Sequence, residues 1–148
     1  MGVPKQLLPW QSTTVLGAAV RKLGEAGACP IVVVLGYEAN AVRAALDPAA
    51  LQQSNVLFTI NQDYAAGEML SSYQTGLRHL LDSADSDRLP PGALLALGDQ
   101  PHVPVSAVRR VIEQALGMPH AIVIPSFGKR RGHPFYMPAG LWNEVLAL

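Results

Sequence analysis

Phosphate chemistry needs cations that can be held close to phosphate oxygens, and the start of the sequence offers one. Gly2-Val3-Pro4-Lys5 places a lysine beside glycine and proline, which is the composition of a loop. A lysine ammonium held in such a loop can lie over phosphate oxygens as a point charge. The same residues also fit a frayed terminus with a solvated lysine, because short glycine, proline and lysine matches are weak evidence by themselves.

A single carboxylate follows the apolar run Ala93–Leu97, within Gly98-Asp99-Gln100-Pro101. In an α/β fold, ligands bind beyond the carboxyl ends of the strands, and Asp99 is expected at that edge. A lone carboxylate there suits Mg²⁺, which prefers oxygen ligands, keeps several waters and bridges to substrate phosphates. The alternative is that Asp99 caps the following turn through its own backbone.

A basic loop, Ser126–Pro134, concentrates three cationic residues and two glycines. An arginine such as Arg131 can bind a phosphate through two parallel hydrogen bonds, and Gly132 lets the backbone approach it closely. His133 can orient a phosphate or satisfy a local backbone group. An ordinary solvated basic loop has the same composition, so that alternative stays open.

Two serines, Ser71 and Ser72, stand near the start of an expected helix, after Gly67-Glu68-Met69-Leu70. The N-terminus of that helix offers free N–H groups and a favourable dipole for an anion. The serines equally fit plain helix caps, which is their commoner role. No ligand partner stands at metal-binding spacing from the remaining candidates, which we expect to be structural or surface residues: His79, His102, His120 and Cys29.

These stretches must be positioned by the elements that the hydrophobic pattern predicts. Apolar runs without polar alternation predict buried strands over 31–35, 56–60, 93–97 and 121–124, with a short segment at 135–137. Apolar residues at helical spacing predict helices carrying Leu16 to Leu23, Val42 to Leu46, Leu70 to Leu81 and Val108 to Ala115, and another from Ala139. Ser12 or Thr13 is expected to cap the first helix, and Gly27 to end it in the left-handed conformation.

The alternation of strands and helices predicts an α/β fold, a three-layer α/β/α sandwich with a Rossmann-like, mostly parallel sheet. The 148 residues favour a single domain, and 49% hydrophobic residues suit a buried sheet. Eleven basic residues balance eleven acidic ones, which argues against a nucleic-acid partner. One cysteine excludes a disulfide framework, and no apolar run is long enough for a membrane span, so we expect a cytoplasmic protein without a membrane partner.

In their order and spacing, four stretches resemble the MobA-like NTP transferases, and most closely the molybdenum cofactor cytidylyltransferase branch. They span nearly the whole chain: Met1–Trp10, Asn61 with Gly67, Leu97–Pro101 and Arg131–Pro134. The form Lys-Gln-Leu-Leu-Pro-Trp looks like the cytidylyl branch more than the guanylyl branch. The resemblance implies the nucleotide-diphospho-sugar transferase type of fold.

The resemblance also implies an activity, the transfer of a nucleoside monophosphate from an NTP to a phosphorylated acceptor with release of pyrophosphate. In the closest branch the donor is CTP and the acceptor is the molybdopterin-type molybdenum cofactor, with a molybdoenzyme or its chaperone as the implied partner. Lys5 matches the lysine that stabilises the NTP phosphates, and Asp99 matches the aspartate that binds Mg²⁺. The implied nucleotide side further includes Gly2, Pro4, Asn61 and Gly67, and the implied acceptor side comprises Ser71, Ser72, Arg131, Gly132 and His133.

The chain departs from the family pattern at both ends. Family members begin with a strand and a Leu-Ala-Ala-Gly-type loop upstream of the Met-Gly found here, and carry a second metal-binding aspartate beyond the position of Leu148. Residues 1–148 are therefore expected to form one nucleotidyltransferase domain that is truncated at both ends and lacks full activity.

Two alternatives remain. One is another nucleotidyltransferase of the same fold, for molybdopterin guanylylation, sugar phosphates or methylerythritol phosphate; the last usually carries an Asp-Ala-x-Arg-Pro motif where this chain has Asp99-Gln100-Pro101. The other is a degenerate, non-catalytic domain that binds a nucleotide or a partner protein. Retention of Lys5, Asp99 and Arg131–Pro134 argues against the second alternative.

Overall fold

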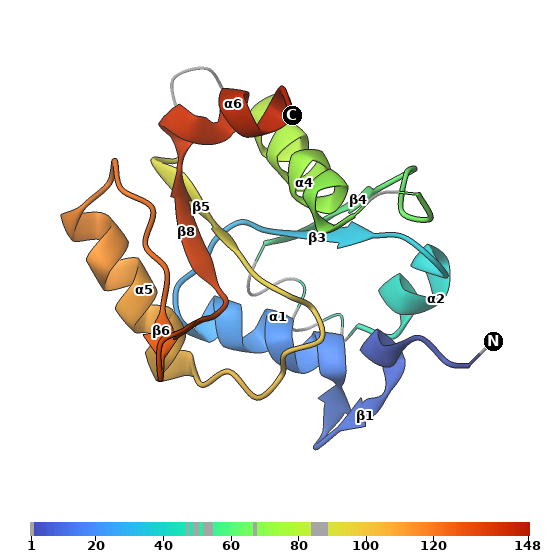
Figure 1. Ribbon diagram of the computed structural model, residues 1–148. Helices are drawn as coiled ribbons and strands as arrows, with labels where there is room; N and C mark the ends of the chain where they lie inside the picture. The colour runs from blue at the N-terminus through green and yellow to red at the C-terminus, as the bar shows by residue number, and fades with distance from the viewer. Residues whose placement is uncertain (1, 47, 49–50, 52–54, 67, 84–88) are drawn as a thin grey trace.

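A computed structural model of the protein describes residues 2–46, 48, 51, 55–66, 68–83 and 89–148 (Figure 1). Near its start lie the 3₁₀ helix η1 (Lys5–Leu7) and the antiparallel strand pair β1 (Pro9–Trp10) and β2 (Thr13–Thr14). Helix α1 (Val15–Glu25) follows directly. It is capped by Thr14, whose hydroxyl accepts a hydrogen bond from the Gly17 amide at 3.1 Å, so the expected cap at Ser12 or Thr13 is wrong by one or two residues. Gly27 takes φ +100°, as expected for the end of the helix.

The first core forms around the strands β3 (Ile31–Leu35) and β4 (Val56–Ile60), which pair in parallel over all five residues. Both strands are confirmed at the predicted bounds. Helix α2 (Ala39–Ala44) connects toward β4, and Arg43 places its guanidinium 4.8 Å from the Phe58 ring centroid. Apolar side chains from α1, β3 and α2 bury one another here, which fixes the parallel pair against its helices: Leu16, Val20, Ile31, Val33, Leu35, Val42 and Leu46.

A second core lies on the other side of the molecule, between helix α4 (Met69–Ser83) and the strands β5 (Gly92–Leu95) and β8 (Phe135–Pro138). These strands pair antiparallel, and a 3₁₀ turn η2 (Ala139–Leu141) leads from β8 into helix α6 (Trp142–Leu146). Trp142 and Leu77 are each only 1% exposed and anchor this core together with Leu95 and Met137.

Helix α5 (Val105–Gly117) packs on β8 through Val111 and Ala115, beside Tyr136. The predicted strand at 121–124 is wrong: only Val123 forms an isolated bridge, to Tyr136. Ile122 and Ile124 are 48% and 41% exposed, so the apolar run is not covered on both faces as its composition suggested. The basic loop beyond it contains a hairpin that the pattern missed, β6 (Ser126–Phe127) with β7 (Arg130–Arg131).

Helices lie on both faces of the strands, with α4 and α6 on one side and α1 and α5 on the other (Figure 1). The α/β class and the three layers therefore agree with expectation. The strand pairing is more mixed than predicted, since β3–β4 is the single parallel pair among the described strands and β5–β8 is antiparallel. Among the described residues, no helix is long and apolar enough to cross a bilayer.

Candidate active site

The pairing of β5 with β8 brings two predicted site residues to one edge of the molecule. Leu95, the last residue of β5, lies opposite Phe135, the first residue of β8. The chain leaving β5 therefore carries Asp99 past the chain that enters β8 with His133. Asp99 is exposed; burial lowers the pKa of His133, and the nearby Asp99 carboxylate offsets part of that fall. Asp99 and His133 are far apart in the sequence, and the register of the β5–β8 pair brings them near each other.

The imidazole of His133 is held by aromatic neighbours. Its Nε2 lies 3.0 Å from the Tyr73 hydroxyl, which α4 supplies from the layer above. Its ring meets Phe135 edge-on with centroids 5.4 Å apart, and Tyr73 meets the same Phe135 ring at 6.1 Å and 86°. Partial burial lowers the pKa of His133 more than Asp99 raises it, because desolvation penalises the charged form. At neutral pH the site therefore holds a neutral imidazole.

The loop that carries Asp99 is fixed from below by α1. The Lys22 ammonium donates a hydrogen bond to the carbonyl oxygen of Pro101, on the far side of Asp99. On the near side, Gly98 packs so closely that an added Cβ would come within 3.1 Å of Leu16 Cδ1. Both flanks of Asp99 are thus anchored while its own carboxylate faces solvent.

Asn61 joins the two serines that the sequence assigned to the acceptor side. Its amide nitrogen donates to the hydroxyl oxygens of Ser71 at 2.9 Å and Ser72 at 3.2 Å, and its carbonyl oxygen accepts from the Asp63 amide at 3.0 Å. Asn61 is 2% exposed, so these bonds satisfy a buried amide. Ser71 also donates to the Glu68 carbonyl oxygen at 2.9 Å, a local side-chain-to-backbone bond three residues back along the chain. This network ties the end of β4 to the start of α4. Gly67, predicted beside it, lies outside the described residues.

The segment that carries the other predicted cation is held mainly by backbone. The Leu7 amide donates to the Pro4 carbonyl oxygen at 2.9 Å, and the Leu8 amide to that of Lys5 at 3.2 Å. Leu7 packs against the first core, whereas Gly2 and Lys5 are exposed. Within the described part of the chain, Lys5 forms no salt bridge. Its ammonium is therefore available to a ligand, and nothing described fixes its direction.

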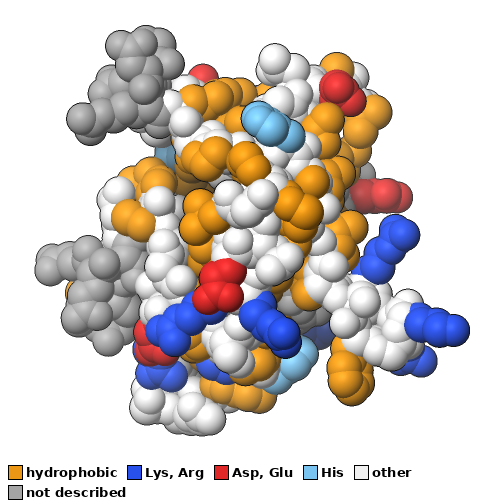
Figure 2. Space-filling model, turned by 90° about the vertical axis from the view of Figure 1, so that its left-hand side faces the viewer, with side chains coloured by type: hydrophobic (Ala, Val, Ile, Leu, Met, Phe, Trp, Pro, Cys, Tyr) orange, Lys and Arg blue, Asp and Glu red, His pale blue; other side chains and the backbone are white. Residues whose placement is uncertain are grey.

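The hairpin β6–β7 presents the predicted basic residues to solvent. Gly128 and Lys129 take φ of +56° and +65° at its two-residue turn, the geometry of a tight hairpin. Arg131 is exposed, and the Gly132 amide donates to the Pro125 carbonyl oxygen at 2.9 Å. On the face drawn in Figure 2, Lys and Arg side chains gather on the lower half, with hydrophobic side chains exposed between them.

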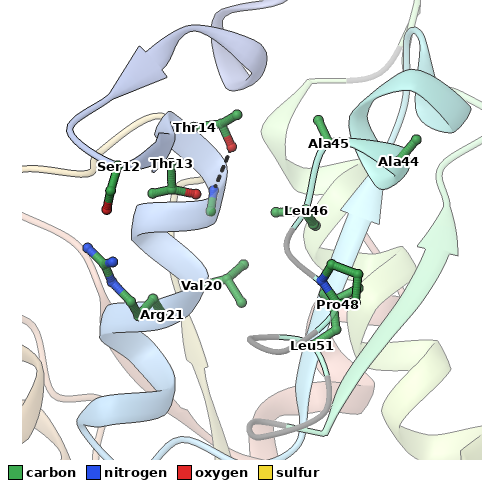
Figure 3. Close-up of a pocket in the computed structure, with 11 residues that line it drawn as sticks. Ser12, Thr13, Thr14, Val20, Arg21, Ala44, Ala45, Leu46, Pro48 and Leu51 are labelled. Carbon is green, nitrogen blue, oxygen red and sulfur yellow. Dashed lines mark hydrogen bonds between the residues drawn. The ribbon is translucent and has the colours of Figure 1, made fainter.

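A cavity of about 460 Å³ lies away from these residues, between the N-terminal half of α1 and the chain that follows α2 (Figure 3). Thr14 and Gly17 line it on the α1 side, and Leu46 and Pro48 face them. None of the predicted site residues that the structure describes lines this cavity. His133 instead lines a cavity of about 20 Å³ with Lys22 and Gln100, space for about one water. The candidate active site is thus an open edge of the molecule. A ligand bound there would stay largely exposed to solvent.

A divalent metal is compatible with the donor set at this edge. No group of three or more His, Cys, Asp or Glu side chains gathers in the described residues. Mg²⁺ seldom needs such a group, because it binds through one or two carboxylates, waters and substrate phosphates. Asp99, exposed and anchored on both flanks, fits that role.

Comparison with known proteins agrees with this fold. The fold is that of the α/β nucleotidyltransferases, which solved structures with the same architecture share. The model of the MobA-like NTP transferase domain matches residues 1–148, and the chain belongs to that family.

Similar proteins carry different names and come from different organisms. A protein named nicotine blue oxidoreductase, from Paenarthrobacter nicotinovorans, is 33% identical over an alignment of 149 positions that covers 96% of this chain and 66% of that protein. Rv0371c of Mycobacterium tuberculosis H37Rv, in a complex with manganese, is 33% identical with a TM-score of 0.74, over 99% of this chain and 71% of that one. A nucleotidyl transferase from Methanothermobacter thermautotroptrophicus is 28% identical with a TM-score of 0.74, over 99% and 64%. The chain thus spans about two thirds of the length of these relatives.

The structure groups the predicted residues into two clusters and adds one residue. Asp99 and His133 lie near each other at the β5–β8 edge, and Asn61 is hydrogen-bonded to Ser71 and Ser72 between β4 and α4. Lys5 and Arg131 lie exposed on separate segments. Sequence reasoning placed Tyr73 in an apolar helical stripe and missed its contact with His133. Its polar tip was the available signal, since a partly buried tyrosine hydroxyl needs a partner.

Proposed function

We propose that this chain provides the catalytic domain of a nucleotidyltransferase, which moves a nucleoside monophosphate from an NTP onto a phosphorylated acceptor and releases pyrophosphate. The observation that carries the proposal is the Asp99–His133 edge, where a carboxylate and a neutral imidazole lie together at the end of β5. Membership of the MobA-like NTP transferase family supports the NTP as substrate.

The proposed roles follow from the chemistry of an attack by one phosphate on another. The two anions repel each other, and the transition state spreads charge over the oxygens of the α-phosphate, so positioning and fixed positive charge supply most of the catalysis. Lys5 would neutralise the triphosphate, and Arg131 the acceptor phosphate. Asp99 would hold a divalent metal, which when bound polarises the phosphate oxygens. The manganese complex of the relative Rv0371c supports a divalent ion in this fold.

The finer proposal names CTP as donor and the molybdopterin-type molybdenum cofactor as acceptor. It rests on the Lys5–Trp10 stretch, which resembles the cytidylyl branch. The decisive experiment supplies CTP, GTP, ATP and UTP in turn, each with Mg²⁺ or Mn²⁺ and molybdopterin-bound molybdenum, and measures pyrophosphate release. Release that is fastest with CTP would support the cytidylyl assignment. A preference for GTP would replace it with the guanylyl one, and turnover of a sugar phosphate or methylerythritol phosphate in place of the cofactor would change the acceptor.

A second candidate function comes from the name of one relative, nicotine blue oxidoreductase. The sequence has one cysteine, and Cys29 is exposed, so electron transfer through a cysteine pair within the chain is impossible. Redox chemistry would require a bound cofactor or an external hydride donor. Oxidation of NADH or NADPH in the presence of a dye acceptor, without pyrophosphate release from any NTP, would favour this candidate over nucleotidyl transfer.

A further inference from the structure

The Tyr73 hydroxyl lies within hydrogen-bond distance of two neighbours. Its oxygen lies 2.8 Å from Met69 Sδ and 3.0 Å from His133 Nε2. A thioether is a weak acceptor, whereas the unprotonated nitrogen of a neutral imidazole is a strong one. The hydroxyl can donate to Met69 Sδ while it accepts from a protonated Nε2, or it can donate to an unprotonated Nε2. Because the O–H···N bond is the stronger one, we expect the hydroxyl to donate to His133.

The direction of that bond determines which nitrogen of His133 carries its proton. A neutral imidazole has one N–H and one acceptor nitrogen. If Nε2 accepts from Tyr73, the proton stands on Nδ1, and that N–H is free to donate. Phe135 contacts both rings edge-on, at 5.4 Å from His133 and 6.1 Å from Tyr73, so packing restrains the orientation that the hydrogen bond selects.

We propose that Tyr73 is a positioning residue, which holds His133 as the Nδ1–H tautomer so that this N–H donates to a phosphate oxygen of the substrate. The substrate part rests on the proposed nucleotidyl transfer, whereas the tautomer part does not. Tyr73 itself touches no reacting atom, because its hydroxyl is used by His133. The arrangement gives the site a donor with a fixed direction beside the negative charge of Asp99.

The tautomer is measured directly by ¹⁵N NMR of the histidine side chains, with His133 assigned through His133→Gln. The wild-type chain should show Nδ1 as the protonated nitrogen. Tyr73→Phe removes only the hydroxyl and keeps the ring against Phe135, and it should shift His133 toward the Nε2–H form. A wild-type His133 in the Nε2–H form, or a tautomer unchanged in Tyr73→Phe, would overturn the assignment.

Two control variants separate this bond from general effects. Met69→Leu removes the sulfur and keeps the hydroxyl, so His133 should retain its Nδ1 proton. Tyr136→Phe removes a different tyrosine hydroxyl, one that donates to Pro91 and Pro119 carbonyl oxygens, and should leave the His133 signals in place. A tautomer switch in either control as large as in Tyr73→Phe would contradict a specific role for the Tyr73 hydroxyl.

Inorganic pyrophosphate probes the substrate part. Its addition should shift the His133 Nδ1 resonance in the wild type, and Tyr73→Phe should bind it roughly two- to tenfold more weakly, the range of one hydrogen bond. If pyrophosphate shifts the His133 resonance but binds the wild type and Tyr73→Phe with equal affinity, Tyr73 has no positioning role. If pyrophosphate does not shift the His133 resonance, His133 does not contact phosphate, whatever its tautomer. Neither result depends on turnover, so a failure here is distinct from a failure of nucleotidyl transfer.

Discussion

The candidate site has two halves, the β5–β8 edge with Asp99 and His133 and the N-terminal segment with Lys5, and the two are held in different ways. At the β5–β8 edge, side chains fix each other: Lys22 holds the loop of Asp99, and Tyr73 and Phe135 hold His133. At the N-terminal segment, backbone bonds shape η1, while the Lys5 side chain extends into solvent. Preorganised groups lose little conformational freedom when a transition state forms, whereas a free lysine must be ordered by the ligand. The first half is therefore expected to set the rate, and the second to set affinity for the triphosphate.

The largest effect is expected at Asp99. Asp99→Asn keeps the size of the side chain and removes its charge, so the metal loses its anionic ligand while the loop keeps its anchors. The kcat of pyrophosphate release should fall on the order of 10²–10³-fold, the effect of losing one preorganised electrostatic group. Asp82→Asn, at an exposed position of α4, is the matched control. Equal turnover in the two variants would remove Asp99 from the mechanism.

The next effect concerns stability. Asn61→Ala deletes the buried amide that binds both serines and the Asp63 amide, and leaves those groups to find other partners. The free energy of unfolding should fall by about 1–3 kcal/mol, the cost of buried polar groups without partners. Denaturant unfolding, with the exposed Asn143→Ala as control, measures it. A change no larger than in the control would mean that the network does not hold β4 to α4.

Lys5 tests the other half of the comparison. Lys5→Ala should weaken CTP binding roughly tenfold, the value of one charge-assisted hydrogen bond, with little change in thermal stability because the side chain is exposed. Arg110→Ala on α5 removes an exposed cation elsewhere and should leave the affinity unaltered. Titration calorimetry distinguishes the two, and a loss of kcat at unchanged affinity would place Lys5 with the preorganised half.

The smallest effect is the pH dependence of folding. Burial holds the pKa of His133 below its value in the unfolded chain, so below about pH 6.5 the unfolded chain binds more protons and stability falls as pH is lowered. His133→Gln should flatten that part of the curve. Thermal unfolding measured across this range checks the sign; a stability that rises on acidification, and loses this rise in His133→Gln, would mean that Asp99 outweighs burial.

Local patterns predicted the strands well where helices cover them on both faces. The β-branched run at 31–35 became β3, with helix α1 on one face and helix α4 on the other, and the run at 56–60 became its partner β4. The run at 121–124 failed, since its neighbours leave Ile122 and Ile124 exposed and composition does not report what covers a strand.

In the candidate site, too, features set by local sequence could be predicted, and contacts set by the packing of distant elements could not. The position of Asp99 beyond a strand could be predicted because a polar residue after an apolar run marks the end of a strand. The contact of Tyr73 with His133 could not be, because it spans 60 positions and depends on how α4 lies over β8. The Asn61 network spans about ten positions, yet its direction toward Ser71 and Ser72 needs the turn between β4 and α4.

The central claim is that the Asp99 edge binds a divalent metal together with phosphate. Calorimetric titration of Mn²⁺ into the chain in the presence of pyrophosphate tests it most directly, with Asp99→Asn and the control Asp82→Asn measured alongside. Asp99→Asn should weaken Mn²⁺ binding roughly tenfold or more, while Asp82→Asn should match the wild type. Equal Mn²⁺ affinity in wild type and Asp99→Asn would contradict it.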